Sequence, residues 1–286
     1  MKTKQHTLWL LAALAAPLAH FSGCGWAMAL LTALTALPLS LVPKCWDEMP
    51  RPLTVIQLLW LGAVTGTLLQ NSAVYWPSDN GFAVPLAIMA LAVLTDSTAA
   101  PRIGAVLAFC MALVFVPAAV AGAKTVESGW LRPTVGPWPW ALTLIQLLPN
   151  LPAAGTAGKG RALLTAGILS VSLALLTQGT ISPQAAANLP APFWQTARTL
   201  GYLEPVIAVG ITLGWYALTV CLLQSARLMA ESAGIRGLWA DVLAVETAVA
   251  FILFKWQLPQ PITALFASLL WVLSPFLIKI KKVEKT

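Results

Sequence analysis

The sequence predicts an all-α polytopic membrane protein with about ten transmembrane helices. Hydrophobic residues make up 58% of the 286 residues and charged residues only 9%, against roughly 25% charged residues in an ordinary soluble domain. Apolar runs of about 20 residues, long enough to cross a hydrocarbon core of about 30 Å, recur along the chain. The connections between these runs are mostly short, so we expect no separate soluble domain.

The apolar runs define spans that we number in chain order. They cover residues 7–22, 24–42, 53–75, 82–99, 101–122, 138–157, 161–180, 202–226, 237–256 and 260–280. With a cytoplasmic amino terminus, thirteen of the 17 Lys and Arg residues fall on the cytoplasmic side. Positive charge concentrates on the cytoplasmic side of membrane proteins, so we expect both termini there. The outer loops then carry interfacial aromatic residues, namely Trp76, Trp130, Trp138, Trp140 and Trp194.

The first run also has features of a cleavable signal peptide. Lys2 and Lys4 precede a short apolar core that contains small residues. Cleavage would leave nine spans and would hardly change the distribution of charge. We expect the run to be retained as a helix, because it continues into the second span without a polar mature segment.

Two of the predicted spans contain helix-breaking residues. Pro149 and Pro152 flank Asn150 in the sixth span, and each proline removes a backbone donor. In the first span Pro17 predicts a bend, and the glycines of residues 23–25 favour flexible backbone. Each break opens a set of five spans, residues 1–122 and 138–280. Five spans per half give the halves opposite orientations, the inverted-repeat arrangement of many secondary transporters.

Polar groups near the breaks are the candidate ligand-binding residues. Half-helix amides attract a carboxylate, and unwound carbonyls hold a cation or an ammonium group. The candidates on the first and sixth spans are His20, Ser22, Gly23, Gly25, Gln146 and Asn150. On the eighth span they are Thr212, Trp215 and Tyr216, and on the third span Thr65 and Gln70. The alternative is that each polar side chain is hydrogen-bonded within the helix bundle.

Ion or proton coupling is predicted for two carboxylates. Glu204 lies just inside the outer end of the eighth span, where the helix N-terminus would also stabilise the anion in a structural role. Glu246 falls near the middle of the ninth span. A carboxylate at that depth is costly in lipid, so we expect it to face the bundle or to be protonated.

Several other classes of function are disfavoured. The chain lacks paired-carboxylate, nucleophile and phosphate-binding motifs, which argues against an enzyme. Its four cysteines have no metal-ligand spacing, so neither a metal nor a cofactor is expected. The net charge of +7 follows the membrane topology rather than a basic stripe, so nucleic-acid binding is not expected either.

Short stretches in several spans resemble a known family. Residues 101–104 read Pro-Arg-Ile-Gly, residues 129–133 Gly-Trp-Leu-Arg-Pro, and residues 147–149 Leu-Leu-Pro. The eighth span begins Tyr-Leu-Glu-Pro at residues 202–205 and continues to Gly-Trp-Tyr at residues 214–216. In this order the stretches resemble the B subunits of spore germinant receptors, which belong to the amino acid, polyamine and organocation transporter superfamily.

The resemblance implies a ten-helix LeuT-like fold with broken first and sixth helices. It also implies a permease-like subunit of the spore inner membrane, or of a cell membrane, that senses a small nutrient such as an amino acid. Its partners would be the receptor's A subunit and lipoprotein C subunit. Two alternatives remain open: a stand-alone secondary amino acid transporter, and a structural membrane subunit that binds no ligand.

Overall fold

The structure is a computed structural model that describes residues 2–39, 51–76, 81–96, 98–134, 159–199 and 203–258. The predicted spans 138–157 and 260–280, and with them Gln146 and Asn150, lie outside the described residues. Within those ranges every regular element is helical. The elements are α1 (Lys2–His20), η1 (Ser22–Cys24), α2 (Trp26–Leu39), α3 (Arg51–Gln70), η3 (Asn71–Tyr75), α4 (Ala83–Val93), α5 (Ala100–Ala123), η4 (Ser128–Trp130), α7 (Lys159–Ile181), α8 (Pro183–Asn188), α9 (Pro192–Thr199), α10 (Glu204–Ser232) and α11 (Gly237–Leu253).

Four of the described helical segments are long and apolar enough to cross a membrane. They are Arg51–Tyr75, Ala100–Ala123, Leu164–Ile181 and Glu204–Ser232. The segments Thr7–His20 and Ala83–Val93 are also apolar but shorter. All six fall on predicted spans, so the described residues are helical as predicted and compatible with an all-α membrane protein. The total of ten spans and the side on which the termini lie stay predictions.

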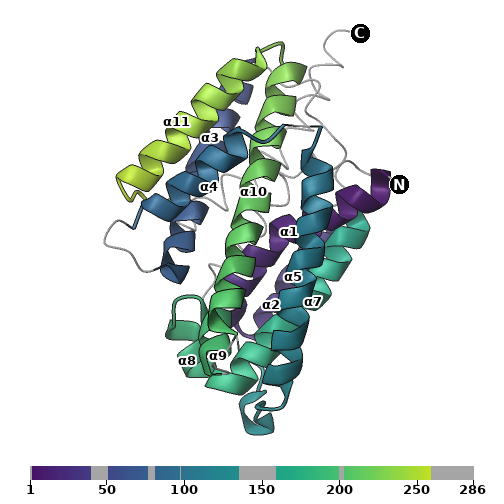
Figure 1. The fold of residues 1–286 in the computed structure, drawn as a ribbon. Helices are drawn as coiled ribbons and strands as arrows, with labels where there is room; N and C mark the ends of the chain where they lie inside the picture. Colours follow the sequence, from purple (N-terminus) through teal and green to yellow (C-terminus); the bar gives the residue numbers. More distant parts are fainter. Residues whose placement is uncertain are drawn as a thin grey trace.

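The helices form two groups that share α10 (Figure 1). In one group, α3, α4 and α11 pack against α10. In the other, α1 and α5 pack against α10, and α7 packs against α1, α2 and α5. Helix α10 contacts both α1 and α5, and its Trp215 is completely buried. The short helices α8 and α9 lie at the end opposite to the turn between α10 and α11 (Figure 1). We call the α8–α9 end the cap end and the opposite end the basic end.

The first span continues as an α-helix through Pro17, and α1 ends at His20. The Phe21 amide donates to the Pro17 carbonyl at 2.9 Å, which closes the last turn of the helix. Packing against α5, α7 and α10 holds α1 helical around the proline. The α-helix breaks after His20, where residues 21–25, with the short helix η1, connect α1 to α2. A bend at Pro17 stays a prediction.

Small residues form the contact between α3 and α11. A Cβ atom added to Gly62 would lie 2.4 Å from the Ala244 carbonyl oxygen, and one added to Gly66 would lie 2.6 Å from that of Ala248. Both alanines are fully buried. Lipid tails are as apolar as leucine, so membrane helices associate through close backbone packing of this kind. The GxxxG spacing of α3 therefore meets an AxxxA spacing in α11.

We expect Gly62→Ala to separate α3 from α11 and to lower stability. Its new methyl group would overlap the Ala244 backbone, and overpacking typically costs about 1–3 kcal/mol. The matched control is Gly81→Ala, because the space around the Gly81 Cβ position is open. Thermal unfolding of the purified protein in detergent measures both variants. Equal melting temperatures would show that the α3–α11 contact is loose.

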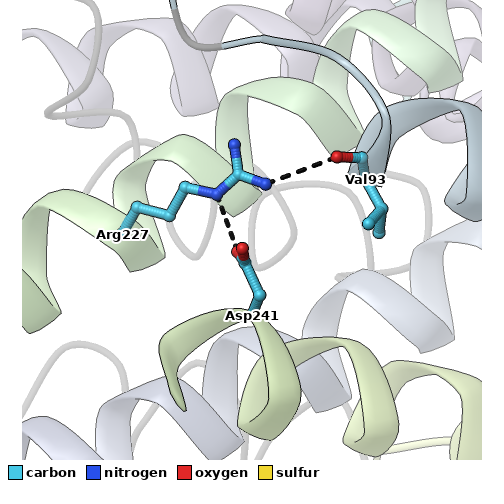
Figure 2. A network of polar contacts seen from close by, with 3 residues as sticks. All are labelled: Val93, Arg227 and Asp241. Atoms are coloured by element: carbon cyan, nitrogen blue, oxygen red, sulfur yellow. Dashed lines mark hydrogen bonds and ion pairs between the residues drawn. The ribbon is translucent and has the colours of Figure 1, made fainter. Parts of the chain in front are cut away.

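An ion pair joins three helices at the basic end. Arg227 Nε of α10 donates to Asp241 Oδ1 of α11 at 2.7 Å, and both side chains are about three-quarters buried. The same guanidinium reaches the carbonyl of Val93 at the end of α4, at 3.5 Å (Figure 2). Nearby, Arg51 Nε at the start of α3 donates to the Ala233 carbonyl at 3.1 Å. Asp241 is thus part of the helix contacts.

Asp241→Asn should destabilise the protein by about 1–2 kcal/mol, between the values typical of exposed and of fully buried pairs. The substitution leaves the Arg227 charge partly buried without its counter-ion. Glu231→Gln, which removes an exposed acid at the same end, should change stability by less than about 0.5 kcal/mol. A double-mutant cycle with Arg227→Gln measures the pairwise coupling by chemical unfolding. A coupling energy of zero would contradict the role of this pair.

Candidate functional site

The connection between α1 and α2 breaks the α-helix, has only the short 3-10 helix η1, and is nevertheless buried. Ser22, Gly23 and Cys24 are all buried, although backbone polar groups at membrane depth must find partners within the protein. The Cys24 amide donates to the Phe21 carbonyl at 3.2 Å, and the Gly25 carbonyl accepts the Ala29 amide at 3.0 Å. The connection thus satisfies these backbone groups locally. It has the irregular backbone that the sequence analysis predicts for a binding site.

Helices α8 and α9 cover this connection. A Cβ atom at Gly23 would lie 1.9 Å from the Ala186 carbonyl oxygen of α8 and 2.6 Å from Pro192 of α9. Gly25 has a φ of +85°, a conformation that L side chains rarely adopt, and it lies against Thr134. Both predicted glycines are therefore required for close approach of backbones. Whether their backbone groups also bind a ligand stays a prediction.

Five aromatic side chains gather beside the connection. They come from α1, η3, α9, α10 and the connection itself, and we call them the aromatic cluster: His20, Phe21, Tyr75, Trp194 and Trp215. The His20 ring centroid lies 4.8 Å from that of Phe21, 6.0 Å from Tyr75 and 5.9 Å from Trp215. Trp194 contacts Tyr75 at 5.7 Å. The cluster therefore connects both helix groups at the cap end.

The polar atoms of the cluster are unequally satisfied. His20 Nδ1 and the Tyr75 hydroxyl form a hydrogen bond of 2.9 Å. The indole N–H groups of Trp194 and Trp215 are buried and have no hydrogen-bond partner within the described residues. Trp215 is 0% exposed and Trp194 9%. An unpaired buried donor costs about 1–3 kcal/mol, so each is a candidate to donate to a bound water or ligand.

The cluster favours a particular ligand chemistry. It offers two indole donors, an imidazole–phenol pair and several aromatic faces, but its members carry no carboxylate, Lys or Arg. Indole donors suit a carboxylate or carbonyl oxygen, and aromatic faces attract an ammonium group. The arrangement fits a small polar solute with an acceptor group better than a metal ion. No group of three or more His, Cys, Asp or Glu side chains able to hold a metal is found in the part of the chain that the structure describes.

Ser22 has a structural role in this arrangement. Its hydroxyl donates to the Ala19 carbonyl at 2.9 Å and accepts a bond of 3.1 Å from Thr177 of α7. The hydroxyl proton is therefore used within the end of α1, and the bond from Thr177 joins this connection to α7. Ser22 lies beside the aromatic cluster but contributes no free donor to it.

The three candidates on α10 point in different directions. Trp215 enters the aromatic cluster, whereas the Tyr216 hydroxyl hydrogen-bonds with Thr95 Oγ1 at 2.7 Å. Thr212 Oγ1 accepts from Trp76 Nε1 at 2.7 Å and donates to its own helix at Ala208. With 3.6 residues per turn, neighbouring positions are about 100° apart around the axis. Only Trp215 of the three is thus brought to the site.

The two candidates on the third span are bonded within the bundle. Thr65 Oγ1 donates to the Leu61 carbonyl at 2.6 Å. Gln70 Nε2 donates to the carbonyls of Phe251 and Trp256, each at 2.8 Å. Thr65 and Gln70 are thus hydrogen-bonded within the helix bundle, which was the alternative to ligand binding. The Gln70 bonds join the end of α3 to the end of α11.

The two predicted coupling carboxylates lie away from the cluster. Glu204 is the first residue of α10 and forms a loose ion pair of 3.7 Å with Arg198, largely exposed to solvent. Glu246 is exposed on α11, so it does not face the bundle as one of the two expectations held. Ala240, Ala244 and Ala248 are buried on the side of α11 that packs against α3 and α10. Glu246 therefore lies on the outer side of that helix. A role of either residue in coupling stays a prediction.

Sequence reasoning missed three members of the site. Phe21 and Tyr75 were not candidates, and Trp194 was expected at the membrane interface but is buried. A signal for Trp194 was present: Phe193, Trp194 and Ala197 repeat at the spacing of one helix face and are all buried in α9. Tyr75 had no comparable signal, because its position depends on how η3 leaves α3.

Comparison with known proteins adds no relative. The chain matches no protein-family model and no curated protein sequence.

Tyr75→Phe should lower stability by about 1 kcal/mol, because it removes the hydroxyl that pairs with His20 in a buried site. The comparison is Tyr216→Phe, which also removes one phenolic hydroxyl. Its partner Thr95 keeps a hydrogen bond to the Leu91 carbonyl, so the loss should be smaller. Chemical unfolding in detergent gives both values. The reverse order would show that the His20–Tyr75 bond contributes little.

Proposed function

We propose that this chain is a permease-like membrane subunit that binds a small nutrient, such as an amino acid, in the aromatic cluster. The observation that carries the proposal is the pair of unpaired, buried indole N–H groups of Trp194 and Trp215. They lie beside the buried break in the α-helix between α1 and α2, next to the His20–Tyr75 hydrogen bond. A purely structural role would gain nothing from two buried donors that lack acceptors.

Helix contacts support an inverted five-plus-five repeat. If the second half repeats the first, α2, α3 and α4 correspond to α7, α10 and α11. When each helix is replaced by its counterpart, the α3–α11 contact becomes the α10–α4 contact. In the same way, the α3–α4 contact becomes the α10–α11 contact. All four contacts are present, as are the self-corresponding contacts α2–α7, α3–α10 and α4–α11. This pattern favours the LeuT-like architecture that the resemblance implies, with a ligand site between the repeats.

The distribution of charge supports a cytoplasmic basic end. Arg51, Arg227 and Arg236 lie at the ends of α3, α10 and α11 that meet there. The first turns of α1 and α7 add further Lys and Arg residues at that end. With the basic end inside, the α8–α9 cap and the aromatic cluster face the outer side. That side suits a subunit of a spore germinant receptor, which would meet its nutrient from outside and work with A and C subunits.

A ligand screen tests the binding site. Purified protein is heated in detergent with each common amino acid, sugar and nucleoside, and a ligand at one hundred times its dissociation constant adds about 2.7 kcal/mol of stability. We expect one ligand class to raise the melting temperature of the wild type. Trp215→Phe should abolish that shift, because it removes one buried donor but keeps an aromatic ring. Trp239→Phe, the same change at an exposed position on α11, should leave the shift intact.

Two outcomes would contradict the proposal. A screen with no shift for any ligand would argue against nutrient binding, and a shift that survives Trp215→Phe would place the ligand elsewhere. Uptake of the identified ligand into proteoliposomes would favour a stand-alone transporter. Binding without uptake would favour a sensing subunit.

A further inference from the structure

A cavity lies between α1, α5 and α7, outside the aromatic cluster. Its volume is about 620 Å³. We call it the lateral groove, and its lining comprises Leu8, Leu11, Ala12, Ala15 and Leu18 of α1, Ala108, Met111, Ala112, Phe115, Val116, Ala119 and Ala123 of α5, Leu169, Ser172, Leu173, Leu175 and Leu176 of α7, and Val126 and Leu131. Ser172 is the single polar side chain among these residues. The groove therefore offers almost nothing to a polar solute.

The groove opens at the side of the helix bundle. Three large lining residues, Leu8, Val116 and Leu169, are 41%, 60% and 43% exposed. They come from the three helices that Figure 1 shows together on one side of the molecule. In a membrane this face meets the acyl chains of lipids rather than water. An occupant would thus enter from the bilayer.

The shape of the groove is long and closed at the cap end. Its lining along α5 runs from Ala108 to Ala123, which is about 22 Å at the helical rise. Val126 and Leu131 line the cap end, where the Glu127 amide donates to the Gly179 carbonyl of α7 at 2.9 Å. The groove has the length and chemistry for an acyl chain.

Positive charge lies at the other end of the groove. Helices α1, α5 and α7 all begin at the basic end. Helix α5 begins there because a short turn joins it to the end of α4, and α1 runs in the same direction because Trp9 near its start packs on Gly104 near the start of α5. Helix α7 also runs this way, because Thr177 near its end meets Ser22 just after the end of α1, near the cap end. None of their first turns contains an acid. Their first turns together carry Lys2, Lys4, Arg102, Lys159 and Arg161. Helix N-termini add partial positive charge. Asp96, which precedes α5, is hydrogen-bonded to Thr98.

We propose that the lateral groove binds an anionic phospholipid. One acyl chain fills the apolar groove, and the phosphate headgroup lies at the first turns of α1, α5 and α7. Basic sites between membrane helices on the cytoplasmic side bind anionic headgroups in this way. A neutral phospholipid would fill the groove equally well but would gain less from the charges. The site is independent of the nutrient site, because no residue of the aromatic cluster lines the groove.

Native mass spectrometry of the full chain tests this proposal. The protein is purified in detergent, offered equal amounts of phosphatidylglycerol and phosphatidylcholine, and the retained lipids are counted. We expect the wild type to retain phosphatidylglycerol preferentially. Ala112→Trp should fill the groove and remove most of the bound lipid. The control Leu113→Trp adds the same ring to the neighbouring exposed position of α5, which does not line the groove, and should retain lipid like the wild type.

A charge variant tests the headgroup separately. Arg102→Gln, Lys159→Gln and Arg161→Gln together should keep the groove but weaken the preference for phosphatidylglycerol by about fivefold per charge removed. The proposal is overturned if the wild type retains both lipids equally or neither. It is also overturned if Ala112→Trp retains as much lipid as Leu113→Trp. If Ala112→Trp does not fold, an unchanged lipid preference in the charge variant overturns it.

Discussion

The absence of water in the hydrocarbon core constrains every part of this structure. Backbone amides and carbonyls at that depth need partners within the protein, so the chain is helical almost wherever it is described. One break in the α-helices is buried, the connection at residues 21–25. It is possible there because α8 and α9 cover it and because its own amides and carbonyls pair locally. The same cover encloses the aromatic cluster, so the constraint on the backbone also creates the candidate site.

Helix association in this chain relies on small residues rather than on hydrophobicity. Gly62 and Gly66 bring α3 against Ala244 and Ala248 of α11 so closely that a methyl group would not fit. The Arg227–Asp241 pair then joins α10 and α11 to α4 at the basic end. These contacts hold α3, α4, α10 and α11 together as one group. Trp215 of α10 and Tyr75 after α3 connect that group to the aromatic cluster.

The cluster and the lateral groove suit different molecules for one physical reason, the placement of polar groups. In the cluster, two indole donors are buried without acceptors, so a small solute with an acceptor group is stabilised by hydrogen bonds. In the groove, polar groups are nearly absent from the wall, and the charges lie at one end. That arrangement matches an amphiphile. Helix α1 borders both sites, so the two ligands would meet the same helix.

The sequence by itself determined which segments are helical, because apolar runs of membrane length leave the backbone no other choice. The six apolar segments coincide with predicted spans, and the break near residues 21–25 was also found. Only the tertiary structure decided which polar side chains meet. It put Trp215 into the cluster while Thr212 and Tyr216 turned to Trp76 and Thr95, and it buried Trp194 under the cap and left Glu246 outside. Local periodicity fixes the face of a helix on which a residue lies. The neighbour that covers that face depends on contacts between distant segments, which no local pattern encodes.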